Sequence, residues 1–191
     1  MDKMQQLIKF INHSHDISPS KLSSFLYRLN FSRSDFSNWI GDVTSKNASS
    51  NPNPPDEKME QTNIQKTIVH QAPYYEVLLV RWNQQTFSSI HFHEQVEWGI
   101  IQVFGEASYA TFLLNETDMR ADCLTQTMLE DKSLVEINPD TMHQLGNHAN
   151  EPLVTLHIYG NHSPVENISQ SVGRFKLEKE KLVPISDKDA F

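Results

Sequence analysis

The sequence predicts a mainly β protein, a jelly-roll barrel that carries a small N-terminal helical layer. From about residue 66 onward, short β-prone runs recur roughly every dozen residues and are separated by Asn, Gly, Pro and Asp. Several of these runs are apolar on both faces, which is typical of two packed sheets whose outer side is partly covered. The amphipathic segments that precede the runs supply such a cover.

Three short helices are predicted in the N-terminal segment. Apolar residues follow helical spacing over residues 3–12, Ser18 before Pro19 marks the start of a second helix, and residues 32–43 suit a third. Residues 44–60 are rich in Ser, Asn, Pro and charge, which is typical of a connector. The apolar side chains that need a neighbouring layer to cover are Leu22, Phe25, Leu26, Leu29, Phe36 and Ile40.

The β-prone runs indicate an antiparallel sandwich or barrel, because they are short and evenly spaced. They cover residues 74–82, 86–93, 96–105, 107–114, 122–129, 133–139 and 152–160. We therefore expect three parts: helices and a polar connector that pack on the barrel (1–60), the β-barrel itself (61–165), and an extended or partly helical C-terminal tail (166–191).

Composition limits the classes of partner. The chain has 24 acidic and 16 basic side chains, a formal net charge of −8 and no Lys/Arg cluster, which disfavours nucleic acid and anionic membranes. No apolar run reaches the roughly 18 residues of a membrane span, and the N-terminus lacks a signal-peptide pattern. Cys123 is the only cysteine, which excludes an intrachain disulfide and a cysteine-based zinc site. We expect a cytoplasmic monomer or homodimer that acts on small molecules.

Two histidines lie one residue apart in the run "SSIHFHEQVEWG". On a strand, His91 and His93 would point to the same face, while Phe92 would point away. Two imidazoles on one face can bind one metal ion, and His143, after another predicted strand, offers a third ligand. Neutral imidazoles suit Fe, Zn, Ni or Cu. The alternative is a set of structural histidines without a metal.

Around these residues the sequence resembles the cupin superfamily. The first part of the two-part cupin metal signature is met by the two histidines, by Glu97 and by Gly105, with one extra residue before the glycine. The second part is met by Pro139, His143 and Asn147, with one residue fewer between proline and histidine and without the usual glycine. The resemblance implies a metal ion bound inside the barrel, with Glu97 as a candidate fourth ligand.

The last predicted strand, "PLVTLHIYG", alternates strictly. Thr155, His157 and Tyr159 share one face, while apolar residues occupy the other. If the polar face points at the metal, a hydroxyl, an imidazole and a phenol form a hydrogen-bond relay toward a bound molecule. The alternative is a polar ladder on a solvated face.

With this strand, the sequence resembles the thiol dioxygenase family, of the cysteine dioxygenase or 3-mercaptopropionate dioxygenase type, over about residues 64–160. The family has a Trp nine residues before the first histidine, a Gly fourteen residues after it, a third histidine ligand and a Ser-x-His-x-Tyr strand. The residues that meet this pattern are Trp82, Gly105, His143, Thr155 (in place of Ser), His157 and Tyr159. The resemblance implies a cytoplasmic enzyme that uses Fe(II) and dioxygen to oxidise a small thiol to a sulfinic acid.

The chain departs from this family where the substrate would bind. Phe92 stands where members usually have Asp, and Trp98 stands where some carry a cysteine cross-linked to the tyrosine. The arginine that binds the substrate carboxylate should fall near residue 65. Gln65, the residue type of the mercaptopropionate branch, and Lys66 are the candidates, with help from Arg81 or Tyr75. Trp98 is expected near the mouth of the site, and the identity of the thiol stays open.

Glu97 separates the competing hypotheses. As a fourth ligand it would complete a three-His, one-Glu site in a cupin metalloenzyme that acts on a substrate without a thiol. If Glu97 lies off the metal, His91, His93 and His143 leave one face of Fe(II) for a thiolate and dioxygen together. A third hypothesis is a cupin that binds a small molecule without catalysis. Strand parity does not decide, because Glu97 belongs to a different predicted strand from the two histidines.

Overall fold

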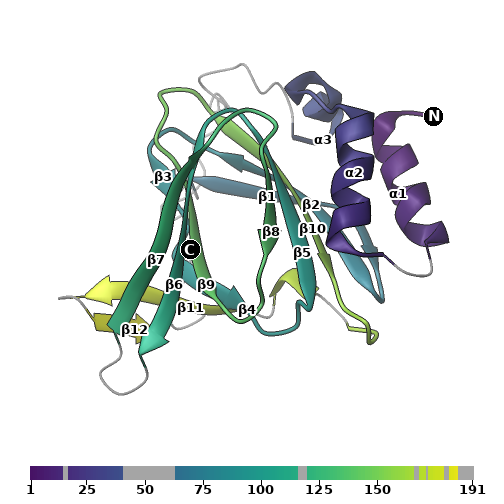
Figure 1. Cartoon of the computed structure of the whole chain (residues 1–191). Coiled ribbons are helices and arrows are strands. Elements are labelled where there is room, and N and C mark those ends of the chain that lie inside the picture. The colour runs from purple at the N-terminus through teal and green to yellow at the C-terminus, as the bar shows by residue number, and fades with distance from the viewer. Residues whose placement is uncertain are drawn as a thin grey trace, which may run out of the picture.

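Two β-sheets form a jelly-roll barrel, and the N-terminal helices lie against the outside of one sheet (Figure 1). The structure is a computed structural model that describes residues 1–14, 17–40, 63–115, 120–165, 168–170, 172–178 and 181–184. The predicted mainly β jelly roll with a small helical layer is confirmed. The predicted connector lies outside the described residues.

The first sheet has five strands in the order β1-β2-β10-β5-β8. Its three middle strands are buried along their whole length, because helices cover one face and the barrel interior covers the other. The strands are β1 (Ile64–Ala72), β2 (Tyr75–Trp82), β10 (Leu153–Gly160), β5 (Trp98–Phe104) and β8 (Leu134–Ile137). The alternation predicted for β10 is confirmed: Leu153 and Tyr159 face the interior, whereas Val154, Leu156 and Ile158 face the helices.

The second sheet has the order β12-β11-β4-β9-β6-β7, with β3 paired to β9. The segment expected as an extended or partly helical tail instead contributes strands β11 and β12, and β11 pairs with β4. The division of the chain at residue 165 stays a prediction. The strands are β3 (Thr86–Phe87), β4 (Ile90–His93), β6 (Ala107–Asn115), β7 (Arg120–Leu129), β9 (Met142–Asn147), β11 (Val172–Glu178) and β12 (Lys181–Pro184).

Local sequence determines where the helices begin. The Asp2 side chain accepts the backbone N–H of Gln5 and forms a capping box at the start of α1 (Lys3–His13). Ser18 caps α2 (Pro19–Leu29), which has Pro19 in its first turn, as predicted. The third predicted helix is a short 3-10 turn, η1 (Arg33–Phe36), followed by α3 (Ser37–Ile40).

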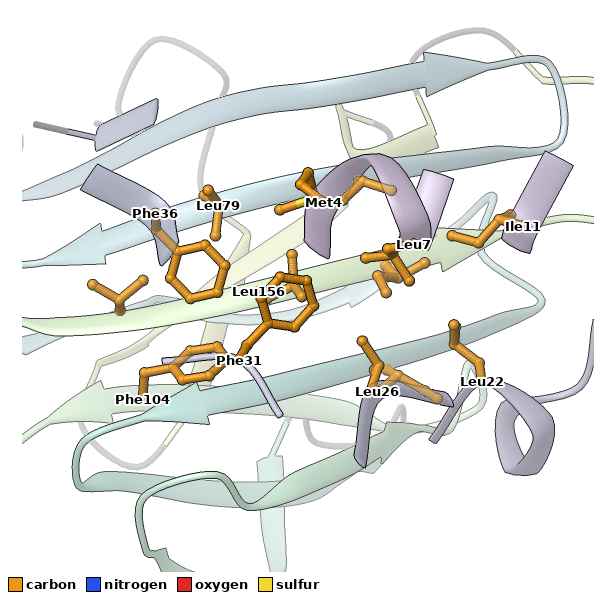
Figure 2. Close-up of a cluster of buried hydrophobic side chains, with 14 of the residues drawn as sticks. Met4, Leu7, Ile11, Leu22, Leu26, Phe31, Phe36, Leu79, Phe104 and Leu156 are labelled. Atoms are coloured by element: carbon orange, nitrogen blue, oxygen red, sulfur yellow. The ribbon is translucent and has the colours of Figure 1, made fainter. Parts of the chain in front are cut away.

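The helices pack on the outer face of β2, β10 and β5 through one apolar cluster (Figure 2). The Phe36 and Phe104 rings meet edge to face, with centroids 4.8 Å apart, and Arg33 Nε donates a 2.8 Å hydrogen bond to the Phe104 carbonyl. This cluster fixes the first sheet from outside and leaves its inner face for a site. Its labelled members in Figure 2 are Met4, Leu7, Ile11, Leu22, Leu26, Phe31, Phe36, Leu79, Phe104 and Leu156. In the described part of the chain, no helix has both the length and the apolar character required to cross a bilayer.

Candidate metal centre

Three histidines meet inside the barrel. His91 and His93 lie on the same side of β4, and His143 on β9 is the direct antiparallel partner of His91. One candidate ligand atom from each residue can be chosen so that all lie within 4.8 Å of one another. The ring centroids of His91 and His143 are 4.3 Å apart, and each is 5.2 Å from that of His93. The structure therefore brings together the three histidines singled out in the sequence.

The protonation of this cluster suits a metal ion. Burial lowers the pKa of His143 well below its usual value, and the neighbouring His91 and His93 add to the effect, against a small opposing contribution from the Thr141 backbone. His143 is therefore neutral near pH 7, and neither ring nitrogen has a well-formed hydrogen bond within the described residues. A buried polar group without a partner is costly, and a metal ion would satisfy it.

A backbone carbonyl orients His91. Its Nδ1 lies 2.9 Å from the carbonyl oxygen of Ser89, which can only accept, so Nδ1 carries the proton and Nε2 keeps its lone pair. Metal-binding histidines commonly donate their second N–H in this way. Three imidazoles and no thiolate fit a divalent first-row transition metal better than Ca²⁺ or Mg²⁺. The cluster is thus a candidate three-histidine metal centre.

A buried hydrogen-bond chain runs along β10 beside the cluster. Trp82 Nε1 donates to Thr155 Oγ1 at 2.8 Å, Thr155 Oγ1 lies 2.7 Å from His157 Nε2, and His157 Nδ1 lies 2.7 Å from the Tyr159 hydroxyl. The Tyr159 ring centroid is 4.6 Å from that of His93. Gly99 makes room for this ring, since a Cβ there would lie 2.9 Å from Tyr159 Cδ1. The predicted polar face therefore points into the barrel.

An indole N–H can only donate, so Thr155 accepts from Trp82. We infer that the Thr155 proton goes to His157 Nε2, which lies 2.7 Å away. In this tautomer a neutral His157 donates from Nδ1 to Tyr159, and the Tyr159 hydroxyl can donate its own proton into the site.

The pKa values of this chain agree with neutral members. Burial, together with the charges of Lys66 and His91, lowers the pKa of His157 to about 3. Burial raises the pKa of Tyr159 far above its usual range, with smaller contributions from Tyr109 and Glu76. Tyr159 is therefore a protonated phenol at neutral pH, which can donate a hydrogen bond.

The sequence analysis did not identify two further residues of the barrel interior, Glu76 and Tyr109. Glu76 is fully buried, pairs with Tyr159 across the sheet, and accepts a 2.9 Å hydrogen bond from the backbone N–H of Ser169 in η2 (Ile168–Gln170). Tyr109 on β6 stacks on His143 with centroids 5.9 Å apart. Period-two alternation was the available signal, but both faces of these strands carry apolar residues, so the pattern did not identify the inner face.

The candidate carboxylate-binding residues fall on both sides of the first sheet. Lys66 pairs with Val80, an interior residue, and its charge acts on His157. Gln65 pairs with Arg81, which in turn pairs with Val154 under the helices. Directly paired residues share a face, so Gln65 and Arg81 lie on the outer face and their expected placement beside the metal is wrong.

Trp98 and Glu97 also lie away from the cluster. Trp98 belongs to the apolar layer under the helices and fits against Gly160, where a Cβ would lie 1.9 Å from the indole, so its expected place at the site mouth is wrong. Glu97 Oε2 accepts the backbone N–H of His162 at 2.7 Å, and its side chain is 45% exposed. The structure does not bring Glu97 to the three histidines.

No family model matches the chain, and no curated protein matches it. Solved structures that are similar include an oxalate oxidase, at 12% identity and a TM-score of 0.44, over 55% of this chain and 54% of that one. KdgF from Halomonas sp. has 18% identity and a TM-score of 0.42, over 55% and 87% of the two chains. An uncharacterised Klebsiella pneumoniae protein with a double-stranded β-helix domain has 16% identity and a TM-score of 0.44, over 56% and 80%.

The chain thus spans about half the length of the oxalate oxidase that it matches. A likeness at this level concerns the barrel and carries no information about metal or substrate.

Proposed function

We propose that the protein is an Fe(II)-dependent thiol dioxygenase, which converts a small thiol and dioxygen into a sulfinic acid (RSH + O2 → RSO2H). The observation that carries the proposal is the chain from Trp82 to Tyr159, which ends beside His93 in the three-histidine cluster. A generic metal-binding barrel does not require a phenol whose hydroxyl is held by a chain of three buried residues.

The histidines would hold the ion through their ring nitrogens, and a bound Fe(II) would supply Lewis acidity and redox chemistry toward dioxygen. His143 needs no deprotonation near pH 7, because burial keeps it neutral. Tyr159 donates a hydrogen bond into the site, and His157 and Thr155 hold its hydroxyl in that direction. His93 and His143 are buried and His91 is half-buried, which limits the access of water to the reacting molecules.

Lys66 is the candidate for binding a substrate carboxylate. It lies on the same face of the sheet as the barrel interior, its residue is exposed, and its positive charge acts on His157. A single ammonium binds a carboxylate as a point charge rather than as a bidentate fork. This supports a thiol of the cysteine or mercapto-acid type, with a small thiol and dioxygen as the molecules that the protein binds in the cytoplasm.

The competing metalloenzyme hypothesis requires Glu97 as a ligand or base. Its contacts with His162 and its exposure argue against that role. No specific contact favours a binder without catalysis.

The test is metal analysis combined with an oxygen electrode, over cysteine, cysteamine, 3-mercaptopropionate and mercaptosuccinate. We expect iron in the protein, oxygen uptake only with a thiol, and one sulfinate formed for each dioxygen consumed. Tyr159→Phe should slow uptake while iron stays bound. Iron without thiol-dependent uptake would refute the proposal, and uptake lost in Glu97→Ala but kept in Tyr159→Phe would favour the competing enzyme.

A further inference from the structure

Tyr109 brings a second phenol to the three-histidine cluster, from the same sheet as the histidines and opposite the sheet that carries Tyr159. It lies on β6 and pairs with Leu145 on one side and Thr127 on the other. Leu145 and Tyr109 belong to the same interior cluster, so the side chain points into the barrel, where it is 9% exposed. Nothing in the hydrogen-bond chain on β10 requires this residue.

The position of Tyr109 relative to the histidines is well defined. Its ring lies nearly parallel to that of His143, at an interplanar angle of 29°. It is close enough to Tyr159 for its charge, when ionised, to raise the Tyr159 pKa. His143 and His93 are thus flanked by phenols that come from opposite sheets.

The Tyr109 hydroxyl has no hydrogen-bond partner within the described part of the chain. A phenol keeps its proton at pH 7, so this hydroxyl can donate a hydrogen bond. The other phenols with similar burial behave differently: Tyr75 donates to Asn12 at 3.0 Å, and Tyr159 is bonded to His157. The Tyr109 oxygen is not fully buried, so a water or a ligand can reach it. The hydroxyl therefore offers a hydrogen-bond donor to a polar molecule bound beside the cluster.

We propose that the Tyr109 hydroxyl donates a hydrogen bond to the small molecule held at the three-histidine centre, from the sheet that faces Tyr159. Tyr109 is then a positioning and specificity residue, which favours molecules with an acceptor on the side of the second sheet. The inference rests on the metal centre of the proposed function, but not on a thiol substrate.

The test uses azide as the probe and the cobalt(II)-loaded full chain, whose visible spectrum reports on the coordination of the ion. Azide affinity is compared in the wild type, Tyr109→Phe and the matched control Tyr75→Phe, which removes a buried phenol oxygen on the outer face. Loss of one hydrogen bond should raise the azide dissociation constant roughly fivefold to tenfold in Tyr109→Phe. It should stay unchanged in Tyr75→Phe.

Two controls exclude a purely structural role. Tyr109→Phe keeps the ring on His143, so it should bind as much cobalt as the wild type and unfold at no lower temperature. Tyr75→Phe should lower the unfolding temperature only slightly, because Asn12 is exposed and water can replace its lost partner. Wild-type azide affinity in Tyr109→Phe would overturn the inference.

The two proposals can fail separately. If the wild type shows no thiol-dependent oxygen uptake but Tyr109→Phe weakens azide binding, the thiol dioxygenase proposal fails and the role of Tyr109 stands. If thiols trigger uptake but azide affinity and the KM for every thiol are unchanged in Tyr109→Phe, the role of Tyr109 fails and the enzyme proposal stands. A wild-type protein that binds neither cobalt nor iron would refute both.

Discussion

Replacing Thr155 with Val tests the direction of the buried hydrogen-bond chain. Thr155 is fully buried, accepts from Trp82 at 2.8 Å and faces His157 Nε2 at 2.7 Å. Valine has nearly the same shape, so the substitution removes the hydroxyl without opening a large cavity. Thr155→Ser is the matched control, because it keeps the hydroxyl and removes only a methyl group.

The change should affect both stability and activity. Val leaves the Trp82 N–H and His157 Nε2 buried and unpaired, and at about 1–3 kcal/mol for each group we expect a loss of about 2–6 kcal/mol in the free energy of unfolding. His157 can then carry its proton on Nε2 and accept from Tyr159, so the phenol no longer donates into the site. Removing a positioned donor of this kind should lower kcat/KM roughly a hundredfold. Ser should cost only about 1 kcal/mol for the lost methyl and keep most of the activity.

The assays are urea unfolding of the metal-free protein and initial rates of thiol-dependent oxygen uptake by the iron-loaded protein. Iron content is measured in each variant, so that loss of metal is not taken for loss of the donor. The reasoning is refuted if Thr155→Val and Thr155→Ser show the same kcat/KM and the same unfolding free energy.

Three further predictions concern the metal centre and the substrate. His143→Ala should remove most of the bound iron, whereas His162→Ala should keep it, and a His143→Ala protein with full iron content by metal analysis would exclude His143 as a ligand. The folded chain binds protons to His143 and His157 less readily than the unfolded chain does, because their pKa values are lowered, to about 3 for His157. Above about pH 6.5 both histidines are neutral in the folded and unfolded chain, and the free energy of unfolding is at its full value. As the pH falls below this, the unfolded chain takes up protons first, so the free energy of unfolding decreases by up to about 1.4 kcal/mol per pH unit for each histidine. The urea midpoint of the metal-free protein should therefore decrease from pH 7 to pH 4.5, and a constant midpoint would contradict these pKa shifts. Lys66→Met should raise the KM for 3-mercaptopropionate more than that for cysteamine, and equal increases in steady-state rates would reject a carboxylate contact.

The sequence determined the parts of the site that lie within one strand. Residues two apart on a strand share a face. Spacing alone therefore predicts that His91 and His93 point to the same side, and that Thr155, His157 and Tyr159 do so as well. Helix caps such as Ser18 are equally local, because the capping side chain bonds to a backbone group a few residues away.

Only the tertiary structure decided which face turned inward and which strands became neighbours. Lys66 and Gln65 are adjacent in sequence and both exposed, yet the pairing of β1 with β2 puts Lys66 on the face of the barrel interior and Gln65 on the outer face. Trp98 was expected at the mouth of the site, yet its side chain packs in the apolar layer under the helices. The approach of His143 to His91, and of Tyr109 to His143, depends on the register of β9 between β4 and β6. That register is set by contacts between residues tens of positions apart, which no local pattern of side chains encodes.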